Sequence, residues 1–260
     1  MKLDQFTVNA FSGRQFGGNP AAVVPLASWL PEQLMQAIAA QNNLSETAFF
    51  VPEADGFGLR WFTPDVEVDL CGHATLATAH VLVNELGHTE LPLRFNTRSG
   101  ELLVQREASA LSLDFPAYNI AEAPLDQALV SALGGSPFAA YSSAFELYLY
   151  ESEAEVRALS PDMVGLKQAS ASAVIATAVG ESVDFVSRFF GPQVGIDEDP
   201  VTGSAHCALV PLWAQRLGKT RLAALQVSTR GGELDCELQG GRVVMRGHAR
   251  TFQRGQIELD

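Results

Sequence analysis

The sequence predicts an α+β protein built from two similar lobes. Three observations support this prediction. The 260 residues are 47% apolar, strand-like and helix-like segments alternate irregularly, and two segments half a chain apart resemble each other. This length allows one large domain or two lobes of about 130 residues each, and the internal similarity favours two lobes.

The periodicity of apolar residues predicts the elements of the first half in order. Alternation after Leu3 indicates a first strand, and Pro31 with Leu34 and Ile38 indicates a helix with one apolar face. An alanine-rich segment that Gly87 ends indicates a second helix, and short strands follow it. The expected elements are strands over 5–11, 21–24, 44–51, 58–62, 91–95, 101–106 and 111–115, and helices over 31–41 and 72–86.

The prolines Pro116 and Pro124 mark the expected boundary between the lobes, and a helix over 125–133 opens the second lobe. We therefore expect lobes over 1–117 and 118–249. Strands are also expected over 241–247 and 250–259, and residues 250–260 are a candidate for a return to the first lobe. Pro211 is expected to kink or shorten the helix in which it lies.

Composition excludes several classes of partner. The net charge is −13 and no run of Lys or Arg exceeds a pair, so neither nucleic acid nor an anionic membrane surface is an expected partner. The smoothest apolar stretch, 169–179, is too short to span a bilayer, and the N-terminus lacks a secretory signal. Three cysteines without C-x-x-C spacing argue against a disulfide framework and favour the cytoplasm.

Two segments share one pattern: Arg, an aromatic residue, Phe, any residue, Pro, an acidic turn, and then Gly-x-Ala at the start of an alanine-rich helix. The first begins at Arg60 and the second at Arg188. Their glycines, Gly72 and Gly203, lie 131 residues apart. This period is too long for a solenoid repeat, so we interpret it as a duplicated fold in which each lobe mixes sheet and helix.

The two glycine-led helix starts are candidate anion sites. The first N–H groups of a helix lack internal partners and carry the positive end of its dipole, so they can hold a carboxylate without a basic side chain. The alternative is that both glycines only permit tight turns from strand to helix. The duplication favours the anion interpretation, with Gly72, Ala74, Gly203, Ser204 and Ala205 as substrate-binding residues.

Five separated motifs together resemble the PhzF-like phenazine-biosynthesis family. They span nearly the whole chain, and their order is specific although each alone is weak. This resemblance implies the diaminopimelate epimerase-like fold, in which each lobe wraps a mixed, barrel-like sheet around a central helix, with a cleft between the lobes. The motifs are Gly18-Asn19-Pro20-Ala21, Ser45-Glu46-Thr47-Ala48-Phe49, Phe62-Thr63-Pro64, Cys71-Gly72-His73-Ala74-Thr75 and Asp199-Pro200-Val201-Thr202-Gly203-Ser204-Ala205.

The resemblance also implies roles for single residues. Glu46 corresponds to the acid/base of the family, and His73, Asp199 and Ser204 correspond to its other site residues. The implied reaction moves one proton between ring carbons of a hydroxylated dihydro-anthranilate, without metal or organic cofactor. A homodimer is implied as well.

These roles agree with the chemistry of the side chains. Glu46 lies in an apolar segment, where desolvation would disfavour its charge and let it both take and return a proton. His73 falls in the first turn of its helix, where the dipole is expected to lower its pKa and keep the imidazole neutral. Asp199 could fix a substrate amine or the imidazole, and Ser204 could bind a carboxylate. Either could instead be a helix cap.

Three other chemistries are less consistent with the pattern. Cys71 resembles one half of the thiol pair of diaminopimelate epimerase, but the second repeat has no cysteine at the matching position. A metal site is not expected, because His73 and His80 lie seven residues apart without a third ligand at helical spacing. A serine hydrolase built on Ser204 would lack the G-x-S-x-G turn.

The predicted function is therefore a cofactor-independent isomerase for a small anionic substrate. Two alternatives stay open at this point: an amino-acid epimerase or racemase, and a protein that binds a small carboxylate without transforming it. The presence of Glu46 favours catalysis, because a carboxylate buried beside an anionic ligand would only weaken binding.

Overall fold

The computed structural model describes residues 1–260, and these form two compact units. The first contains residues 1–114 and 246–260, and the second contains residues 115–245. The sequence analysis placed its divisions a few residues later, at 117 and 249. The chain passes from one unit to the other inside two strands, β8 (Ala110–Pro116) and β17 (Arg242–Gly247).

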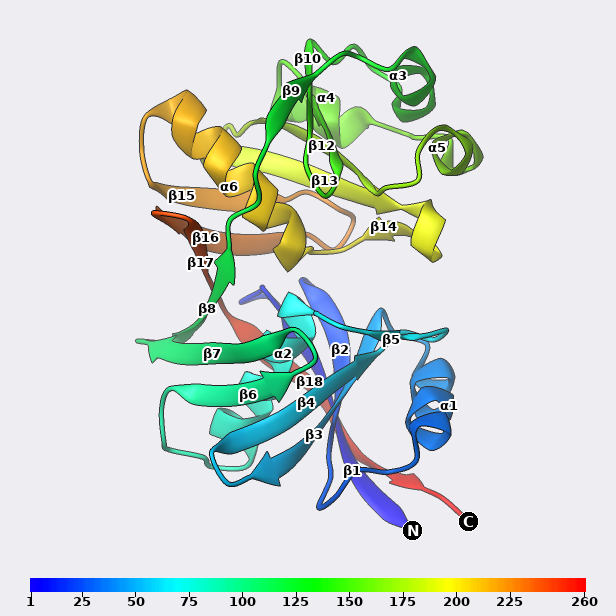
Figure 1. The fold of residues 1–260 in the computed structure, drawn as a ribbon, viewed down its shortest axis with the longest axis vertical. Helices are drawn as coiled ribbons and strands as arrows, with labels where there is room; N and C mark the ends of the chain where they lie inside the picture. Colours follow the sequence, from blue (N-terminus) through cyan, green and yellow to red (C-terminus); the bar gives the residue numbers. More distant parts are fainter. The chain divides into compact units, whose positions relative to one another are not determined.

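The first unit is a mixed sheet with a helix packed inside its curve (Figure 1). Strands β2 and β3 pair in parallel, as do β4 and β6, and the other pairs are antiparallel. The further elements are β1 (Lys2–Ala10), β2 (Asn19–Pro25), α1 (Glu32–Asn42), β3 (Glu46–Glu53), β4 (Gly56–Phe62), β5 (Glu67–Val68), α2 (Gly72–His80), η1 (Val81–Glu85), β6 (Leu93–Thr97), β7 (Gly100–Glu107) and β18 (Ala249–Glu258).

Helix α2 is the central element of the first unit. Every residue from His73 to Ala79 is buried, and the helix contacts β1, β2, β3 and β18. A helix that is buried all round must be made of small or apolar residues, which explains its alanines and threonines. Its hydroxyls are satisfied locally, because Thr75 and Thr78 donate to the carbonyls of Cys71 and Ala74.

The second unit repeats this layout (Figure 1). Strands β11 and β12 pair in parallel, as do β13 and β15, while α6 packs on β15 and β16. Its elements are β9 (Ala121–Ala123), α3 (Gln127–Leu133), β10 (Ala139–Ser142), β11 (Glu146–Leu149), α4 (Glu153–Ala158), α5 (Met163–Ala169), β12 (Val174–Val179), β13 (Phe185–Gly191), η2 (Pro192–Val194), β14 (Ile196–Asp199), α6 (Gly203–Leu217), β15 (Arg221–Gln226) and β16 (Gly232–Gln239).

The two units share one order of strand pairing. In the first unit β2 is parallel to β3, β3 antiparallel to β4, β4 parallel to β6, and β6 antiparallel to β7. In the second unit β11, β12, β13, β15 and β16 follow the same sequence of parallel and antiparallel pairs. The motif Gly-x-Ala opens α2 in one unit and α6 in the other. The predicted duplication is therefore confirmed by the topology.

The repeated arginine makes the same contact in both units. Arg60 on β4 donates two hydrogen bonds to Glu67 on β5, at 2.7 and 2.6 Å, and lies over the ring of Phe62. Arg188 on β13 donates to Glu198 on β14, at 2.7 and 3.0 Å, and its guanidinium lies over an aromatic ring two residues on. In each repeat a glutamate on the next short strand is thus the bidentate partner of the arginine.

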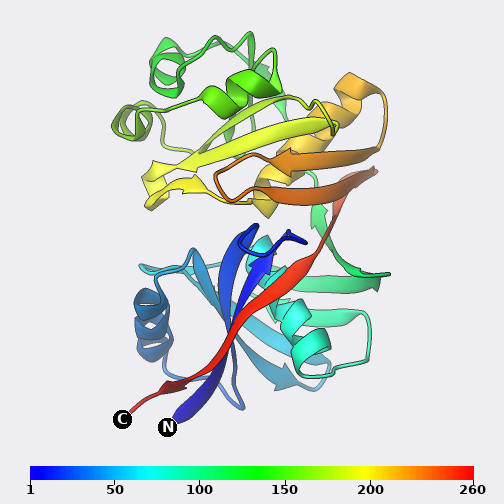
Figure 2. The same cartoon turned by 180° about the vertical axis from the view of Figure 1, so that it is seen from behind.

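The two chain ends lie side by side in the first unit, as both views show (Figure 2). Strand β18 pairs antiparallel with β1 over nearly its whole length, with Lys2 opposite Glu258. The C-terminal segment therefore returns to the unit in which the chain begins.

Two helix predictions need correction. Helix α2 was expected to continue to residue 86, but from Val81 the chain forms a π-helical turn, in which the Leu86 amide donates to the Val81 carbonyl at 2.9 Å. Pro211 was expected to kink or shorten its helix, and the shortening is wrong, because α6 continues through Pro211 to Leu217. Pro211 has no N–H for the Cys207 carbonyl four residues back, and the Tyr118 amide donates to that carbonyl at 2.9 Å instead.

No helix in this structure is both long enough and apolar enough to cross a membrane.

Candidate active site

Glu46 is the first residue of β3, where this strand pairs in parallel with β2 opposite Ala21. The residues after it along the strand, from Thr47 to Val51, are buried. The side chain of Glu46 is 12% exposed. Its carboxylate is therefore held at the amino end of two buried strands and largely out of solvent.

His73 brings its ring to this carboxylate. It is the second residue of α2, its side chain is 5% exposed, and its Nε2 lies 3.1 Å from Glu46 Oε2. Neither of these two atoms has an aligned hydrogen bond. The contact is therefore an ion pair only when the imidazole is protonated, and both atoms keep capacity to bond a further group.

The other ring nitrogen of His73 faces two different side chains. Asn19, the first residue of β2, places its amide nitrogen 3.3 Å from Nδ1, and Cys71 places its sulfur 3.5 Å from the same atom. The amide oxygen of Asn19 accepts a hydrogen bond from the Ser45 hydroxyl at 3.4 Å. Asn19 and Glu46 are the first residues of β2 and β3. Because these strands are parallel, both residues lie at the same end of the sheet, next to the first turn of α2.

Burial and charge act in opposite directions on these groups. Burial raises the pKa of the Cys71 thiol to about 11, and the negative charge of Glu46 adds to this rise. Burial lowers the pKa of His73, but a Cys71 thiolate and the Glu46 carboxylate raise it, and the net pKa lies well above 6.5. The thiol is protonated at neutral pH, so Glu46 is the partner that favours the imidazolium there.

The expectation of a neutral imidazole rested on the dipole of α2, which acts to lower the pKa of His73. The structure adds Glu46, whose carboxylate lies 3.1 Å from the ring and acts in the opposite direction. The charge of the ring thus depends on the groups that face its two nitrogens.

The donor atoms of Glu46, Cys71 and His73 all lie within 4.8 Å of one another, which is a set that could hold a metal ion. Spacing in the sequence did not reveal this set, because Glu46 precedes Cys71 by 25 residues and lies on a different element. The imidazole, however, stands between the other two groups, with Nε2 toward Glu46 and Nδ1 toward Cys71. One ion takes one nitrogen of a ring, so this arrangement corresponds to a chain of polar contacts rather than to a chelate.

Asp199 ends β14 in the second unit, and it is 7% exposed. Its carboxylate accepts a hydrogen bond from the Thr202 hydroxyl at 2.5 Å, and its backbone carbonyl accepts one from the Gln226 amide at 2.7 Å. Gln226 also accepts from the Thr202 amide at 2.8 Å. These bonds hold the Asp-Pro-Val-Thr loop rigidly ahead of α6.

The starts of α2 and α6 differ from those of three other helices. Helices α3, α4 and α5 are capped by the side chains of Asp126, Ser152 and Asp162. The N-cap residues of α2 and α6, Cys71 and Thr202, make no side-chain cap. Neither Asp199 nor Ser204 is thus an N-cap residue, and the N-cap residues of these two helices do not cap the first amides with their side chains.

Sequence reasoning missed the role of Asn19. The only indication in the sequence was its place in the Gly-Asn-Pro motif, which was used as evidence for the family resemblance and not for a site residue. Its contact with His73 spans 54 residues and depends on how β2 and α2 pack.

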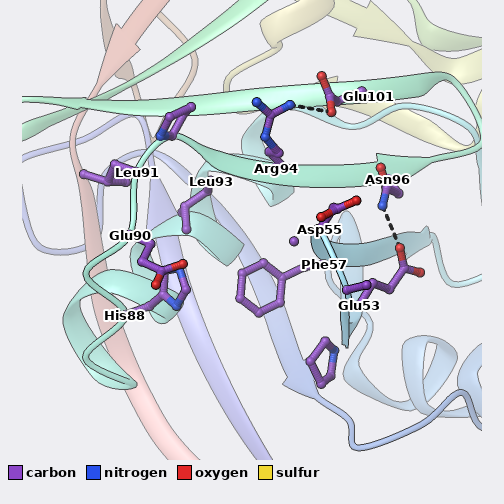
Figure 3. A pocket seen from close by; sticks show the side chains of 14 residues that line it. Glu53, Asp55, Phe57, His88, Glu90, Leu91, Leu93, Arg94, Asn96 and Glu101 are labelled. Carbon is purple, nitrogen blue, oxygen red and sulfur yellow. Dashed lines mark hydrogen bonds and ion pairs between the residues drawn. The ribbon is translucent and has the colours of Figure 1, made fainter.

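A separate cavity of about 910 Å³ lies elsewhere in the first unit, and Figure 3 shows it. It is lined by the β3–β4 turn, by the segment before β6 and by β6 itself, with Phe57 and His88 in edge-to-face contact. Two of its carboxylates are partnered, Glu53 by Asn96 and Glu101 by Arg94 (Figure 3). Glu53 ends β3 whereas Glu46 begins it, so this cavity lies about 23 Å along the strand from the predicted site.

Comparison with known proteins identifies a family whose model spans the residues of this site. The family model PhzC-PhzF, described as phenazine biosynthesis-like protein, matches residues 8–255, which include every residue discussed above for the site. The chain belongs to the PhzC-PhzF family. An uncharacterized isomerase of Pseudomonas aeruginosa is 50% identical to this PhzF-like chain over 259 residues and covers 100% of both proteins.

Solved structures agree with both the family and the fold. A PhzF-family protein from Enterococcus faecalis has a TM-score of 0.97 and 46% identity over 100% of both chains. A probable proline racemase from Agrobacterium radiobacter has a TM-score of 0.65 and 12% identity over 99% of this chain and 93% of its own, and this likeness shows the fold alone. The chain is therefore a PhzF-like isomerase with the predicted diaminopimelate epimerase-like fold.

Proposed function

We propose that this PhzF-like isomerase moves a proton between carbon atoms of a small carboxylate substrate, and that Glu46 both takes and returns the proton. The observation that supports this most is the contact of Glu46 with His73, two side chains that are 12% and 5% exposed and lie 3.1 Å apart. A base for carbon acids works best when water is kept from it.

The proposed step balances without an added reactant. The Glu46 carboxylate takes a proton from a substrate carbon, and the electron pair of the broken C–H bond moves into the conjugated system of the substrate. The resulting carboxylic acid of Glu46 then delivers the proton to a second carbon, and the double bond shifts. His73, whose Nε2 lies 3.1 Å from Glu46, is placed to donate to negative charge that develops on the substrate. The chemistry proposed is similar to that of trans-2,3-dihydro-3-hydroxyanthranilate isomerase.

Substrate binding is proposed for the starts of α2 and α6. Their N-cap residues make no side-chain cap. The first amides belong to, or lie beside, Gly72, Ala74, Gly203, Ser204 and Ala205. Such amides favour a carboxylate even in a protein of net charge −13. Asp199 is proposed as a further catalytic residue, held in place by Thr202 and Gln226.

The proposal includes turnover without metal or organic cofactor, a homodimeric assembly and a place in the cytoplasm. These follow from the family resemblance and from the cysteine pattern described above. The activity of the enzyme after treatment with a chelator tests turnover without metal. The molecular mass of the protein in solution tests the homodimer.

The direct test is a panel of small hydroxy- and amino-carboxylates incubated with the protein in deuterated water. The proposal expects one member of the panel to gain deuterium and to yield a product whose double bond has moved. An inverted stereocentre with deuterium at the same carbon would identify an epimerase instead. A ligand that raises the melting temperature but gains no deuterium would favour the non-catalytic binding protein, and would count against Glu46 as a base.

A further inference from the structure

Asn19 occupies a fully buried position between two polar groups of the candidate site. Its side chain is 0% exposed, and the residue lies at the start of β2 against the first turn of α2. The amide nitrogen faces His73 Nδ1 at 3.3 Å, and the amide oxygen faces the Ser45 hydroxyl at 3.4 Å. A buried carboxamide needs partners at both ends, and these two contacts supply them.

The direction of each hydrogen bond follows from the chemistry of the partners. The Ser45 hydroxyl donates to the oxygen of Asn19, so the Asn19 nitrogen is the end that meets the ring. An amide N–H can only donate, and it therefore needs a lone pair on His73 Nδ1. The Cys71 sulfur at 3.5 Å from Nδ1 is also a donor while it carries its proton. Both neighbours of Nδ1 thus favour an unprotonated nitrogen.

We propose that Asn19 is a positioning residue that holds neutral His73 in the tautomer with its proton on Nε2, the nitrogen 3.1 Å from Glu46. The ring can then exchange protons only on the side of Glu46, because Nδ1 is closed by Asn19 and Cys71. That this arrangement serves catalysis rests on the proposed function of Glu46. The tautomer itself is a property of the free protein.

The same contact opposes protonation of the ring. An imidazolium would carry a proton on Nδ1 and meet the N–H of Asn19, so the amide would have to turn. Glu46 faces Nε2 and favours the imidazolium, whereas Asn19 facing Nδ1 favours the neutral ring. Cys71 is the third group that faces the ring, and it is a donor at Nδ1 in its protonated form. An aspartate at position 19 would reverse the preference, because a carboxylate accepts from a protonated Nδ1.

The chain contains a matched control for this geometry. The amide of Asn84 faces His80 Nδ1 at 3.0 Å, and Thr251 faces His80 Nε2 at 2.9 Å. This histidine lies at the end of α2, away from Glu46. The substitution Asn84→Asp therefore makes the same chemical change beside a different histidine.

The test is nitrogen NMR of the protein labelled with ¹⁵N-histidine, without substrate, over a range of pH. The five histidines allow His73 to be assigned by the loss of its signals in His73→Gln. In the wild-type protein, at a pH where His73 is neutral, we expect Nδ1 at the shift of an unprotonated nitrogen and Nε2 at that of a protonated one. A proton on Nδ1 in neutral wild-type His73 would overturn the proposal.

The variants test the part played by Asn19. In Asn19→Asp we expect the Nδ1 signal to move to the protonated position and His73 to titrate at least one pH unit higher, a tenfold change in proton affinity. In Asn84→Asp the signals of His73 are expected to stay in place. An unchanged His73 in a folded Asn19→Asp protein would remove Asn19 from this role. Because no substrate is used, these results are independent of whether Glu46 proves to be the base.

Discussion

Cys71 lies beside the proposed catalytic pair and still differs from a catalytic thiol. Its side chain is buried, its sulfur is 3.5 Å from His73 Nδ1, and its pKa is raised to about 11. A thiolate needs a positive or polar environment to form near neutral pH, and burial beside Glu46 supplies the opposite. The structure thus supports the earlier preference for a single carboxylate over a thiol pair.

The first prediction concerns the reactivity of this thiol. At neutral pH, Cys71 of the native protein should react with iodoacetamide at least about tenfold more slowly than the same residue in the urea-unfolded chain, because little thiolate forms and the sulfur is buried. Peptide mass spectrometry after timed alkylation measures both rates. Equal rates in the native and unfolded proteins would show that Cys71 is an exposed, activated nucleophile.

At the residue scale, motifs predicted which side chains belong together but not how they touch. The apolar neighbours of Glu46 indicated its shelter, and its exposure in the structure is 12%. The distance from Glu46 to His73 and the contact of Asn19 with the ring depend on strand pairing and helix packing between distant segments. Spacing along one segment carries no information on such contacts.

In helix α6 a hydrogen bond from outside the helix compensates for the one that its proline removes. Proline inside a helix removes one hydrogen bond, and here the orphaned carbonyl of Cys207 is taken by the amide of Tyr118. The helix keeps its 15 residues because that segment of the chain lies beside it. The expected shortening followed from the local effect of proline. It does not occur, because the Tyr118 amide, 89 positions before Cys207 in the sequence, bonds the carbonyl that Pro211 leaves free.

His206 on α6 carries the second prediction. It is fully buried, Nδ1 lies 2.8 Å from the Thr202 carbonyl, and burial lowers its pKa from 6.5 to about 4. The unfolded chain therefore binds a proton between about 6.5 and 4 that the folded protein does not. Stability is fully present above this window and falls as the pH drops through it, by about 3 kcal/mol.

Urea unfolding of the wild-type protein and of His206→Gln at a series of pH values checks this prediction. The stability advantage of the wild type over the variant should shrink as the pH falls from about 6.5 to about 4. His248→Gln, at an exposed histidine, is the control for the loss of one histidine side chain. A constant difference between wild type and His206→Gln would show that His206 does not titrate abnormally.

At the scale of the whole molecule, duplication was the most predictive feature of the sequence. Two Arg-to-Gly-x-Ala segments, whose glycines lie 131 residues apart, indicated two equivalent units, and the strand pairing of both units is the same. In each unit the repeated arginine also donates two hydrogen bonds to one glutamate. These features were predictable because duplication repeats a physical solution, a charged pair that ties a short acidic strand to its neighbour.

Much of the second unit was not predictable in the same way. No strands were assigned between residues 134 and 240, where the structure has β10 to β16. Helices α4 and α5, which lie between β11 and β12, were not expected either. These helices are short and capped by Ser152 and Asp162, and several apolar runs in this region suit either a helix or a strand. Tertiary packing around the cluster of Tyr148, Tyr150 and Phe190 decides between them.

The central claim is that one sheltered carboxylate moves the proton, and Glu46→Gln tests it most directly. Once the panel has identified a substrate, solvent deuterium incorporation should fall by at least about 100-fold in Glu46→Gln, because the amide can neither take nor return a proton. Glu53→Gln makes the same change at the other end of β3 and should exchange like the wild type. Wild-type exchange by a folded Glu46→Gln protein would contradict this account of the site.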